Sequence, residues 1–206
     1  MPKFALYAKR YTLNASKLLL IASCLSIFLS GCSVVGSSKP AALQITTNPD
    51  SAVFLNGKHV GKTPFYSDQL KEGEYDIKLS AAEASFSEKV SLTSATLTVV
   101  NRDLNNNYFA QSGETLWLDP TKHGLFITTS PNQANVEIDG KSQGLSPVLV
   151  EKPQAGDHKV TITKEGYINR EFAIKTSNSS ALYAQVTLAS QIAKGANNQG
   201  TIAPSP

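Results

Sequence analysis

Residues 45–64 read ITTNPDSAVFLNGKHVGKTP, and residues 127–147 read ITTSPNQANVEIDGKSQGLSP. The two stretches share their opening residues, a Pro shortly after them, a Gly-Lys pair and a Gly-x-x-Pro ending. The similarity continues to Gly73, which matches Gly156 once a residue inserted near Asn135 is allowed for. Such self-similarity indicates two copies of one module of about 65 residues, too few for a solenoid. We therefore expect each copy to fold as a small domain of its own.

The shared residues are those that form β-hairpins. Asn56-Gly57 lies between Val53–Leu55 and Lys58–Val60, and Asp139-Gly140 occupies the same place in the second copy. Such pairs favour a type I′ turn, because both central residues of that turn need a positive φ. The Pro residues that follow end each hairpin, since Pro cannot donate to a β-ladder. We assign these turn residues to backbone geometry rather than to ligand binding.

The rest of each copy also reads as β-structure. Residues 158–162, HKVTI, alternate with period two, which predicts that Val160 and Ile162 face a core. Residues 75–79 match them in the first copy. Long stretches with a helical apolar period are missing after residue 32, which favours an all-β fold. Further strands are predicted at residues 86–92, 97–102, 168–174 and 182–188.

This pattern resembles the PEGA domain, a small β-sandwich module of bacterial and archaeal surface proteins. The resemblance rests on Pro49–Ala52 and Pro131–Ala134 at the position of the name motif, on the turn glycines, and on Gly166-Tyr167 after a strand of the second copy. It covers residues 43–103, called module 1 below, and residues 125–189, called module 2. Both copies lack the Glu and Gly of the name motif, and the first has Glu83-Ala84 instead of Gly-Tyr. The resemblance implies two tandem β-sandwich-like modules and no defined ligand.

The N-terminus predicts a bacterial lipoprotein signal peptide at residues 1–31. Residues 1–17 are basic and residues 18–30 are uncharged, and Leu29-Ser30-Gly31-Cys32 closes the apolar run. The sequence resembles a lipobox, which implies that Cys32 is lipidated and that palmitate label would mark it. Residues 32–42 would then form a lipidated tether. Cys24 also fits a loose lipobox, but cleavage there would leave too short an apolar region.

Two other interpretations of this segment stay open. It could be an uncleaved membrane anchor, although a spanning helix needs roughly 20 apolar residues. Alternatively, Cys32 could be an ordinary cysteine near a cleavage site. Cys24 is the one other cysteine in the sequence, so after cleavage Cys32 would have no disulfide partner.

A lipidated Cys32 implies a cell-envelope protein whose first partner is a membrane. Ser33 follows it, where an Asp would by family analogy retain a lipoprotein at the inner membrane. The expected location is the periplasmic side of the outer membrane in bacteria with two membranes. In bacteria with a single membrane, we expect the outer face of the cytoplasmic membrane.

The net charge of +3 belongs to the predicted signal peptide. Four of the 19 basic residues lie in residues 1–17, so 15 basic and 16 acidic residues follow. Nucleic-acid binding relies on clustered Lys and Arg, so we expect no nucleic-acid partner. An envelope protein or a polysaccharide remains as a partner of the modules.

Residues 104–124 form a joint between the modules that the Asn run and Asp119-Pro120 predict to be irregular. It contains Tyr108, Phe109 and the single tryptophan, Trp117. These side chains either pack on the modules and fix their relative angle, or form an exposed patch for a sugar ring or a partner protein. The tail, residues 190–206, is small and polar, and we expect it to be disordered.

The residues that could support catalysis do not form a site in the sequence. In the alignment of the two copies, Ser142 stands at the position of His59 and Tyr75 at the position of His158. Neither histidine is therefore a property of the module, and His123 lies in the joint. The sequence has no cysteine pair or HExxH motif for zinc and no phosphate-binding loop, so we expect no metal or other cofactor. Asp119 and Asp139 could be proposed as a pair of catalytic acids, but the hairpin turn already accounts for Asp139. We expect a non-catalytic structural or protein-interaction element, or alternatively a protein that binds peptidoglycan or another polysaccharide.

Overall fold

The structure is a computed structural model, and it describes residues 39–197. The predicted signal peptide and Cys32 lie outside the described residues, so lipidation stays a prediction. The described chain is nearly all β-strand with one short α-helix, which confirms the predicted fold class. Within residues 39–197, no helix is long and apolar enough to cross a membrane.

Each module contributes seven strands in the same order. In module 1 they are β1 (Ala41–Asn48), β2 (Ala52–Leu55), β3 (Lys58–Lys62), β4 (Phe65–Leu70), β5 (Gly73–Ser80), β6 (Ser85–Leu92) and β7 (Leu97–Asp103). In module 2 they are β9 (Gly124–Ser130), β10 (Asn135–Ile138), β11 (Lys141–Leu145), β12 (Val148–Val150), β13 (Gly156–Thr163), β14 (Arg170–Thr176) and β15 (Ala181–Thr187). The four further strands predicted from the sequence are confirmed as β6, β7, β14 and β15.

The two predicted hairpin turns are confirmed by backbone geometry. Asn56 and Gly57 have φ of 50° and 77°, and Asp139 and Gly140 have φ of 51° and 74°. The side chain of each first turn residue also accepts a backbone hydrogen bond from the neighbouring strand, at 2.9 Å in both modules. An Asn or Asp is therefore suited to this position twice over, by its φ and by its side-chain oxygen.

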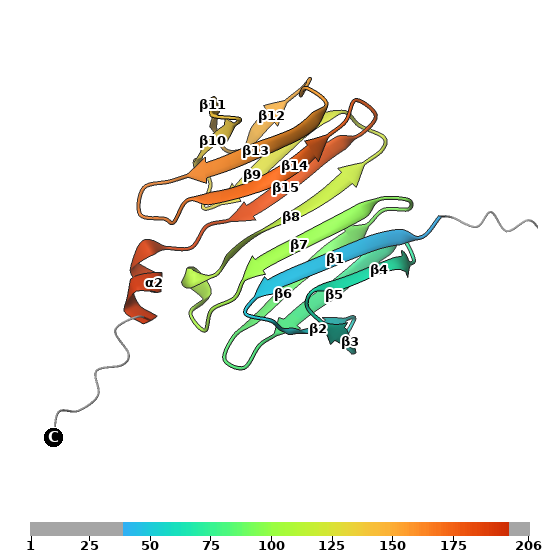
Figure 1. The fold of residues 1–206 in the computed structure, drawn as a ribbon, viewed down its shortest axis with the longest axis vertical. Helices are drawn as coiled ribbons and strands as arrows, with labels where there is room; N and C mark the ends of the chain where they lie inside the picture. Colours follow the sequence, from blue (N-terminus) through green and yellow to red (C-terminus); the bar gives the residue numbers. More distant parts are fainter. Residues whose placement is uncertain (1–38, 198–206) are drawn as a thin grey trace, which may run out of the picture. The chain divides into compact units, whose positions relative to one another are not determined.

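The modules are joined through one continuous sheet. β2, β3, β5 and β6 form a four-stranded sheet in module 1, and β10, β11, β13 and β14 form its counterpart in module 2. The remaining strands form a seven-stranded sheet in the order β12-β9-β15-β8-β7-β1-β4 (Figure 1). Its central strand β8 (Ser112–Asp119) belongs to neither repeat and pairs antiparallel with β7 and β15.

The prediction of an irregular joint is therefore wrong for residues 112–119. Within β8, Leu116 and Leu118 pack on the core of module 2, while Thr115 and Trp117 point to the other face. This alternation is the side-chain period of a β-strand, and β8 has a paired strand on each side. The Asn run and Asp119-Pro120 only mark its two ends.

The two four-stranded sheets lie on opposite faces of the shared sheet. Val100 of β7 pairs with Ile45 and Thr115, whereas Leu116 pairs with Ala184 of β15. Cross-strand partners point to the same face and successive residues alternate, so Val100 and Ala184 lie on opposite faces. We call the face of Val100 face A and that of Ala184 face B. A two-fold rotation about an axis along β8 thus relates the modules approximately.

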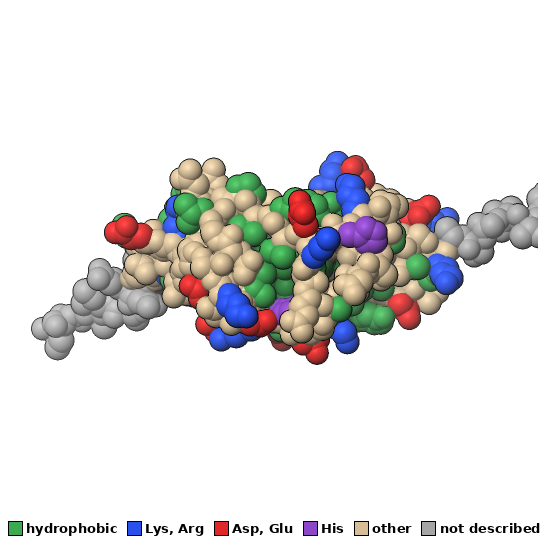
Figure 2. Space-filling model, turned by 90° about the horizontal axis from the view of Figure 1, so that it is seen from above, with side chains coloured by type: hydrophobic (Ala, Val, Ile, Leu, Met, Phe, Trp, Pro, Cys, Tyr) green, Lys and Arg blue, Asp and Glu red, His purple; other side chains and the backbone are tan. Residues whose placement is uncertain are grey.

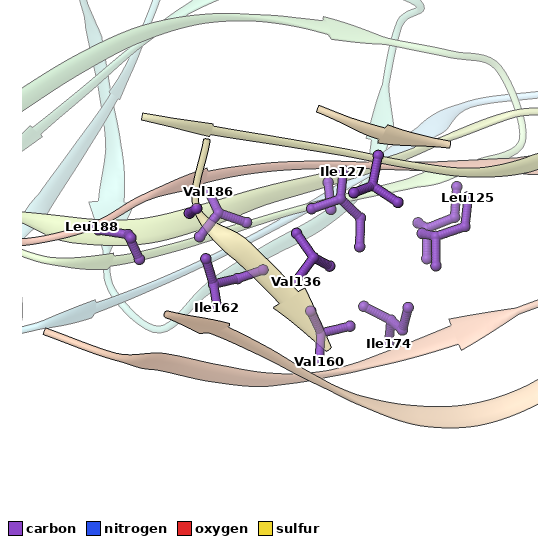
Figure 3. Packing of buried hydrophobic residues seen from close by; sticks show 12 residues of the cluster. Leu125, Ile127, Val136, Val160, Ile162, Ile174, Val186 and Leu188 are labelled. Carbon is purple, nitrogen blue, oxygen red and sulfur yellow. The ribbon is translucent and has the colours of Figure 1, made fainter. Parts of the chain in front are cut away.

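Each module has its own apolar core between its small sheet and the shared sheet. The fully or nearly buried members of the module 1 core are Ala41, Leu43, Ile45, Val53, Leu55, Ile77, Leu79, Val90, Leu92, Val100 and Leu104. Figure 3 shows the module 2 core, where Leu125, Ile127 and Val186 of the shared sheet meet Val160, Ile162 and Ile174. The predicted inward direction of Val160 and Ile162 is confirmed.

The predicted disorder after Ser190 is wrong up to Asn197. Residues Gln191–Asn197 form helix α2, and Ser190 forms a bridge with Tyr167. The backbone N–H of Ser190 donates to the carbonyl of Phe109, and that of Gln191 donates to the carbonyl of Gly166. These tertiary hydrogen bonds order a segment whose composition alone suggests a flexible tail.

Candidate binding surface

The three aromatic residues predicted in the joint fall into two separate settings. Tyr108 and Phe109 lie on a 3₁₀ turn, η1 (Tyr108–Ala110), where each is 70% exposed and their rings meet edge to face at 5.7 Å. Asn107 caps this turn, because its side chain accepts the N–H of Phe109. Trp117 is half-buried on β8, and its ring stacks on that of Tyr183. Only Tyr108 and Phe109 therefore share one exposed patch.

Trp117 is part of a row of stacked aromatic rings on face A of module 2. The Trp117 and Tyr183 rings are 5.3 Å apart and 7° from parallel, and those of Tyr183 and Phe126 are 4.6 Å apart and 8° from parallel. These residues are direct partners on β8, β15 and β9, and Leu149 of β12 follows in the same register. The small sheet of module 2 covers face B, so this row borders solvent.

Module 1 has no such row at the equivalent positions. On its open side, face B, Val99 pairs with Gln44, which pairs with Tyr66 of β4. By the two-fold relation, Val99 corresponds to Tyr183 and Gln44 to Phe126. The aromatic row is thus a property of module 2 and not a requirement of the module fold.

A lysine lies beside the middle ring of the row. Lys122 Nζ lies 5.8 Å from the centre of the Tyr183 ring and 3.4 Å from Asp119 Oδ2. The Thr121 hydroxyl and backbone N–H both donate to Asp119, and they lower the pKa of that carboxyl, with Lys122 adding to the effect. The Asp119-Pro120 turn thereby presents an internally neutralised pair of charges beside the aromatic rings.

A groove of about 260 Å³ separates the aromatic row from strand β6 of module 1. It lies on face A, between the edge of one small sheet and the uncovered half of the shared sheet. Its lining residues are Glu88, Lys89, Val90, Ser91, Thr98, Thr115, Trp117 and Gln185.

A buried ion pair forms the base of one groove wall. The Arg102 side chain is 3% exposed, and its Nη2 donates to Glu88 Oε2 and to Thr115 Oγ1, both at 2.9 Å. The Thr115 hydroxyl in turn donates to Glu88 at 2.9 Å. The guanidinium lies 4.3 Å from the Phe86 ring centre, and its Nε and Nη1 have no partner among the described residues. Glu88 is therefore fixed in place and its charge is neutralised from within.

Gly113 makes room for this ion pair. It is the cross-strand partner of Arg102, and a Cβ at Gly113 would lie 2.1 Å from the Asn101 carbonyl oxygen and 2.7 Å from Arg102 Cδ. No side chain fits at these distances, so the glycine is required by close approach.

A second polar cluster ties β8 to module 2 on face B. Glu114 accepts hydrogen bonds from Arg170 Nε at 2.6 Å and from Asn101 Nδ2 at 2.7 Å. Arg170 also pairs with Asp103 and donates to Ser112. Burial works against the charged guanidinium, but the Glu114 and Asp103 hydrogen bonds outweigh it and raise the pKa of Arg170.

The three histidines do not converge. His59 packs beside Phe54, with ring centres 5.2 Å apart, and His123 is exposed. His158 Nδ1 meets Asp139 Oδ2 at 2.7 Å, and its Nε2 meets the Gln154 carbonyl at 2.7 Å. Across the described part of the chain, no three His, Cys, Asp or Glu side chains are grouped so as to hold a metal ion.

Sequence reasoning missed Phe126, Tyr183, Gln185 and Glu88. Each lies on a strand and reads there as an ordinary alternating residue. The available signal was the repeat itself, because Phe126 and Tyr183 stand where module 1 has Gln44 and Val99. That comparison becomes informative only when the strand pairing is known.

The row continues into an exposed apolar area at the outer edge of module 2. Leu145 and Leu149 are 61% and 51% exposed. Viewed from above the β11–β12 side, hydrophobic side chains gather in the middle of the molecule among charged groups of both signs (Figure 2). These leucines belong to the edge of the sandwich, and the groove lies on the other side of the aromatic row.

Comparison with known proteins identifies the repeated module. The model of the PEGA domain family matches residues 41–107 and residues 123–191, which together are more than half of the chain. The two matches leave out β8, so the strand that joins the modules lies between the two family units. No curated protein and no solved structure matches the chain.

Proposed function

The chain belongs to the PEGA domain family of β-modules with structural or binding roles, and from that premise we propose a non-catalytic lipoprotein of the cell envelope. Lipid on Cys32 would hold it to a membrane, facing the periplasm in bacteria with two membranes. Its two modules would serve as a structural element or as a site for a partner protein. This proposal rests on the N-terminal sequence for location and on the fold for the role.

The observation that carries the role is strand β8. Because β8 pairs with both β7 and β15, the modules act as one rigid platform and not as two beads on a linker. β1 begins at the end of the sheet where the tether would enter, and η1 and α2 lie at the other end (Figure 1). Tyr108 and Phe109 of η1 therefore lie far from the start of β1, and both are 70% exposed, so that a partner protein could reach them.

A crosslinking pull-down from intact envelopes tests this role. We expect specific crosslinked proteins with the full chain and a loss of them in Phe109→Ala. Leu145→Ala, which changes another exposed apolar residue at a different edge, is the control and keeps them. Palmitate labelling tests the anchor, since label that survives Cys32→Ser would contradict it. Hydrolysis of an envelope substrate by the purified chain would contradict the non-catalytic role.

A second candidate function is binding of peptidoglycan or another polysaccharide. The aromatic row of module 2 favours it, because the row has no counterpart in module 1 and so is not explained by folding. Sedimentation with insoluble peptidoglycan tests it. We expect the full chain to sediment and Trp117→Ala to remain in solution; equal sedimentation of both would count against it.

A further inference from the structure

We propose that the groove between β6 and Trp117 binds one uncharged sugar ring of an envelope glycan, an N-acetylhexosamine. This site rests on the second candidate function and specifies it. Four features of the groove support it: the free face of Trp117, the polar groups around that face, the balance of charge and the volume.

Trp117 offers one ring face to the groove. Its other face is covered by Tyr183, which is itself enclosed between Trp117 and Phe126. The neighbour of β8 on the free side is β7, and Thr98 of β7 lines the groove together with Trp117. The stack behind Trp117 also limits its motion. An aromatic ring that is kept in one orientation offers a flat surface on which the apolar side of a pyranose ring can pack.

Polar groups for sugar hydroxyls surround that face. Glu88 uses Oε2 for Arg102 and Thr115, and no hydrogen bond between described residues uses its Oε1. The Gln185 amide, exposed on β15, lines the groove across from β6 and has both donors and an acceptor. A carboxylate oxygen and an amide match hydroxyl groups, which both donate and accept.

The charge balance favours an uncharged ligand. Arg102 neutralises Glu88 at the base of the groove. The charge of Lys89 is balanced as well, because its Nζ lies 3.7 Å from Glu74 Oε2 and 4.0 Å from Asp76 Oδ1. No unopposed charge among the lining residues is left to attract an acidic or basic ligand. A neutral sugar ring complements such a groove, whereas a phosphate-rich polymer does not.

The volume points to one ring. A groove of about 260 Å³ is smaller than the roughly 300–1,000 Å³ of pockets that hold drug-sized ligands. It would take one ring of a chain whose other units pass over the open face of module 2. There, the exposed Gln185 has the exposed Thr128 as its partner on β9, which places two polar side chains beside the aromatic row.

The equivalent place on face B, between β14 and the open half of the shared sheet in module 1, is built differently. Phe172 of β14 corresponds to Glu88, and it packs on the core of module 2. Asn101 corresponds to Gln185, and it is engaged with Glu114. The groove is thus present on one side of the approximate two-fold axis, whereas on the other side Phe172 takes the place of Glu88 and the Asn101 amide is already hydrogen-bonded to Glu114.

Trp117 is the only tryptophan of the chain, so its fluorescence reports on the groove directly. The full chain, held in a detergent without sugar groups, is titrated with chitotetraose. We expect a saturable change in emission and protection from acrylamide quenching. Gln185→Ala should weaken binding about tenfold through loss of one hydrogen-bonding side chain. Gln44→Ala, on the open face of module 1, should leave it unchanged.

Unchanged emission at about 10 mM chitotetraose, above the millimolar Kd of a weak single-ring site, would overturn the proposal. Equal affinities of Gln185→Ala and the full chain would also overturn it. Sedimentation with peptidoglycan distinguishes failure of the groove proposal from failure of the second candidate function. Loss of sedimentation in Trp117→Ala without any effect of Gln185→Ala leaves polysaccharide binding at the aromatic row standing, but without the polar contacts that define the proposed sugar site. Failure of the full chain to sediment removes the second candidate function itself.

Discussion

Modules 1 and 2 share a fold but fasten it with opposite arrangements of charge. In module 1 the shared sheet supplies Arg102 and the small sheet supplies Glu88. In module 2 the shared sheet supplies Glu114 and the small sheet supplies Arg170. Arg102 corresponds to the apolar core residue Val186, and Arg170 corresponds to Phe86. The turns and cores are thus common to both modules, while the contacts at β8 are specific to each.

The largest effect should come from Gly113→Ala. The new Cβ would lie 2.1 Å from a backbone oxygen of the central sheet, which cannot move without displacing β7. We expect a loss of about 4 kcal/mol in the free energy of unfolding, measured by urea denaturation. Gly195→Ala in α2, where nothing lies within 4 Å, is the matched control and should have little effect. Equal stabilities of the two variants would mean that β8 does not lie against β7.

The two ion pairs should differ in strength. Glu88→Gln leaves the Arg102 side chain, 3% exposed, without a charged partner and should cost about 3 kcal/mol. Glu114→Gln leaves Arg170, 16% exposed, still paired with Asp103, so we expect a cost of about 1 kcal/mol. Chemical denaturation of both variants gives the comparison. A larger loss for Glu114→Gln would reverse our assignment of the more deeply buried cluster.

A smaller, pH-dependent effect should come from His158. Its ring nitrogens face a carboxylate and a carbonyl, so both must donate, and the Asp139 hydrogen bond followed by that to Gln154 raises the pKa of His158. A raised pKa stabilises the fold fully below about pH 6.5 and less as the pH rises through the folded value. Nearby Asp157 adds to the shift in His158.

Module 1 supplies the control for this pH effect. Tyr75 corresponds to His158, and its hydroxyl donates to the Lys71 carbonyl at 3.1 Å. His158→Tyr should therefore keep one hydrogen bond and lose the pH dependence. We expect the stability of the unmodified chain to fall relative to His158→Tyr between about pH 6 and pH 9 in urea denaturation. Parallel pH profiles would contradict a charged His158.

The fold could be predicted from the sequence where a backbone conformation admits only a few residue types. Asn56-Gly57 and Asp139-Gly140 predict their turns because few other residues adopt the required φ. β8 was not predictable in this way, since its ends look like a linker and its pairing partners, β7 and β15, are far apart in the sequence. The site was harder still, because Trp117, Tyr183 and Phe126 come from three strands and meet only through the order β8-β15-β9.

Hydrogen exchange along residues 112–119 tests the central claim, that β8 fuses the modules into one sheet. We predict that the hydrogen-bonded amides of β8 exchange as slowly as those of β7 and β15, because all three are internal strands of the same sheet. Exchange of the β8 amides at the rate of an unstructured linker, with β7 and β15 still protected, would contradict the claim.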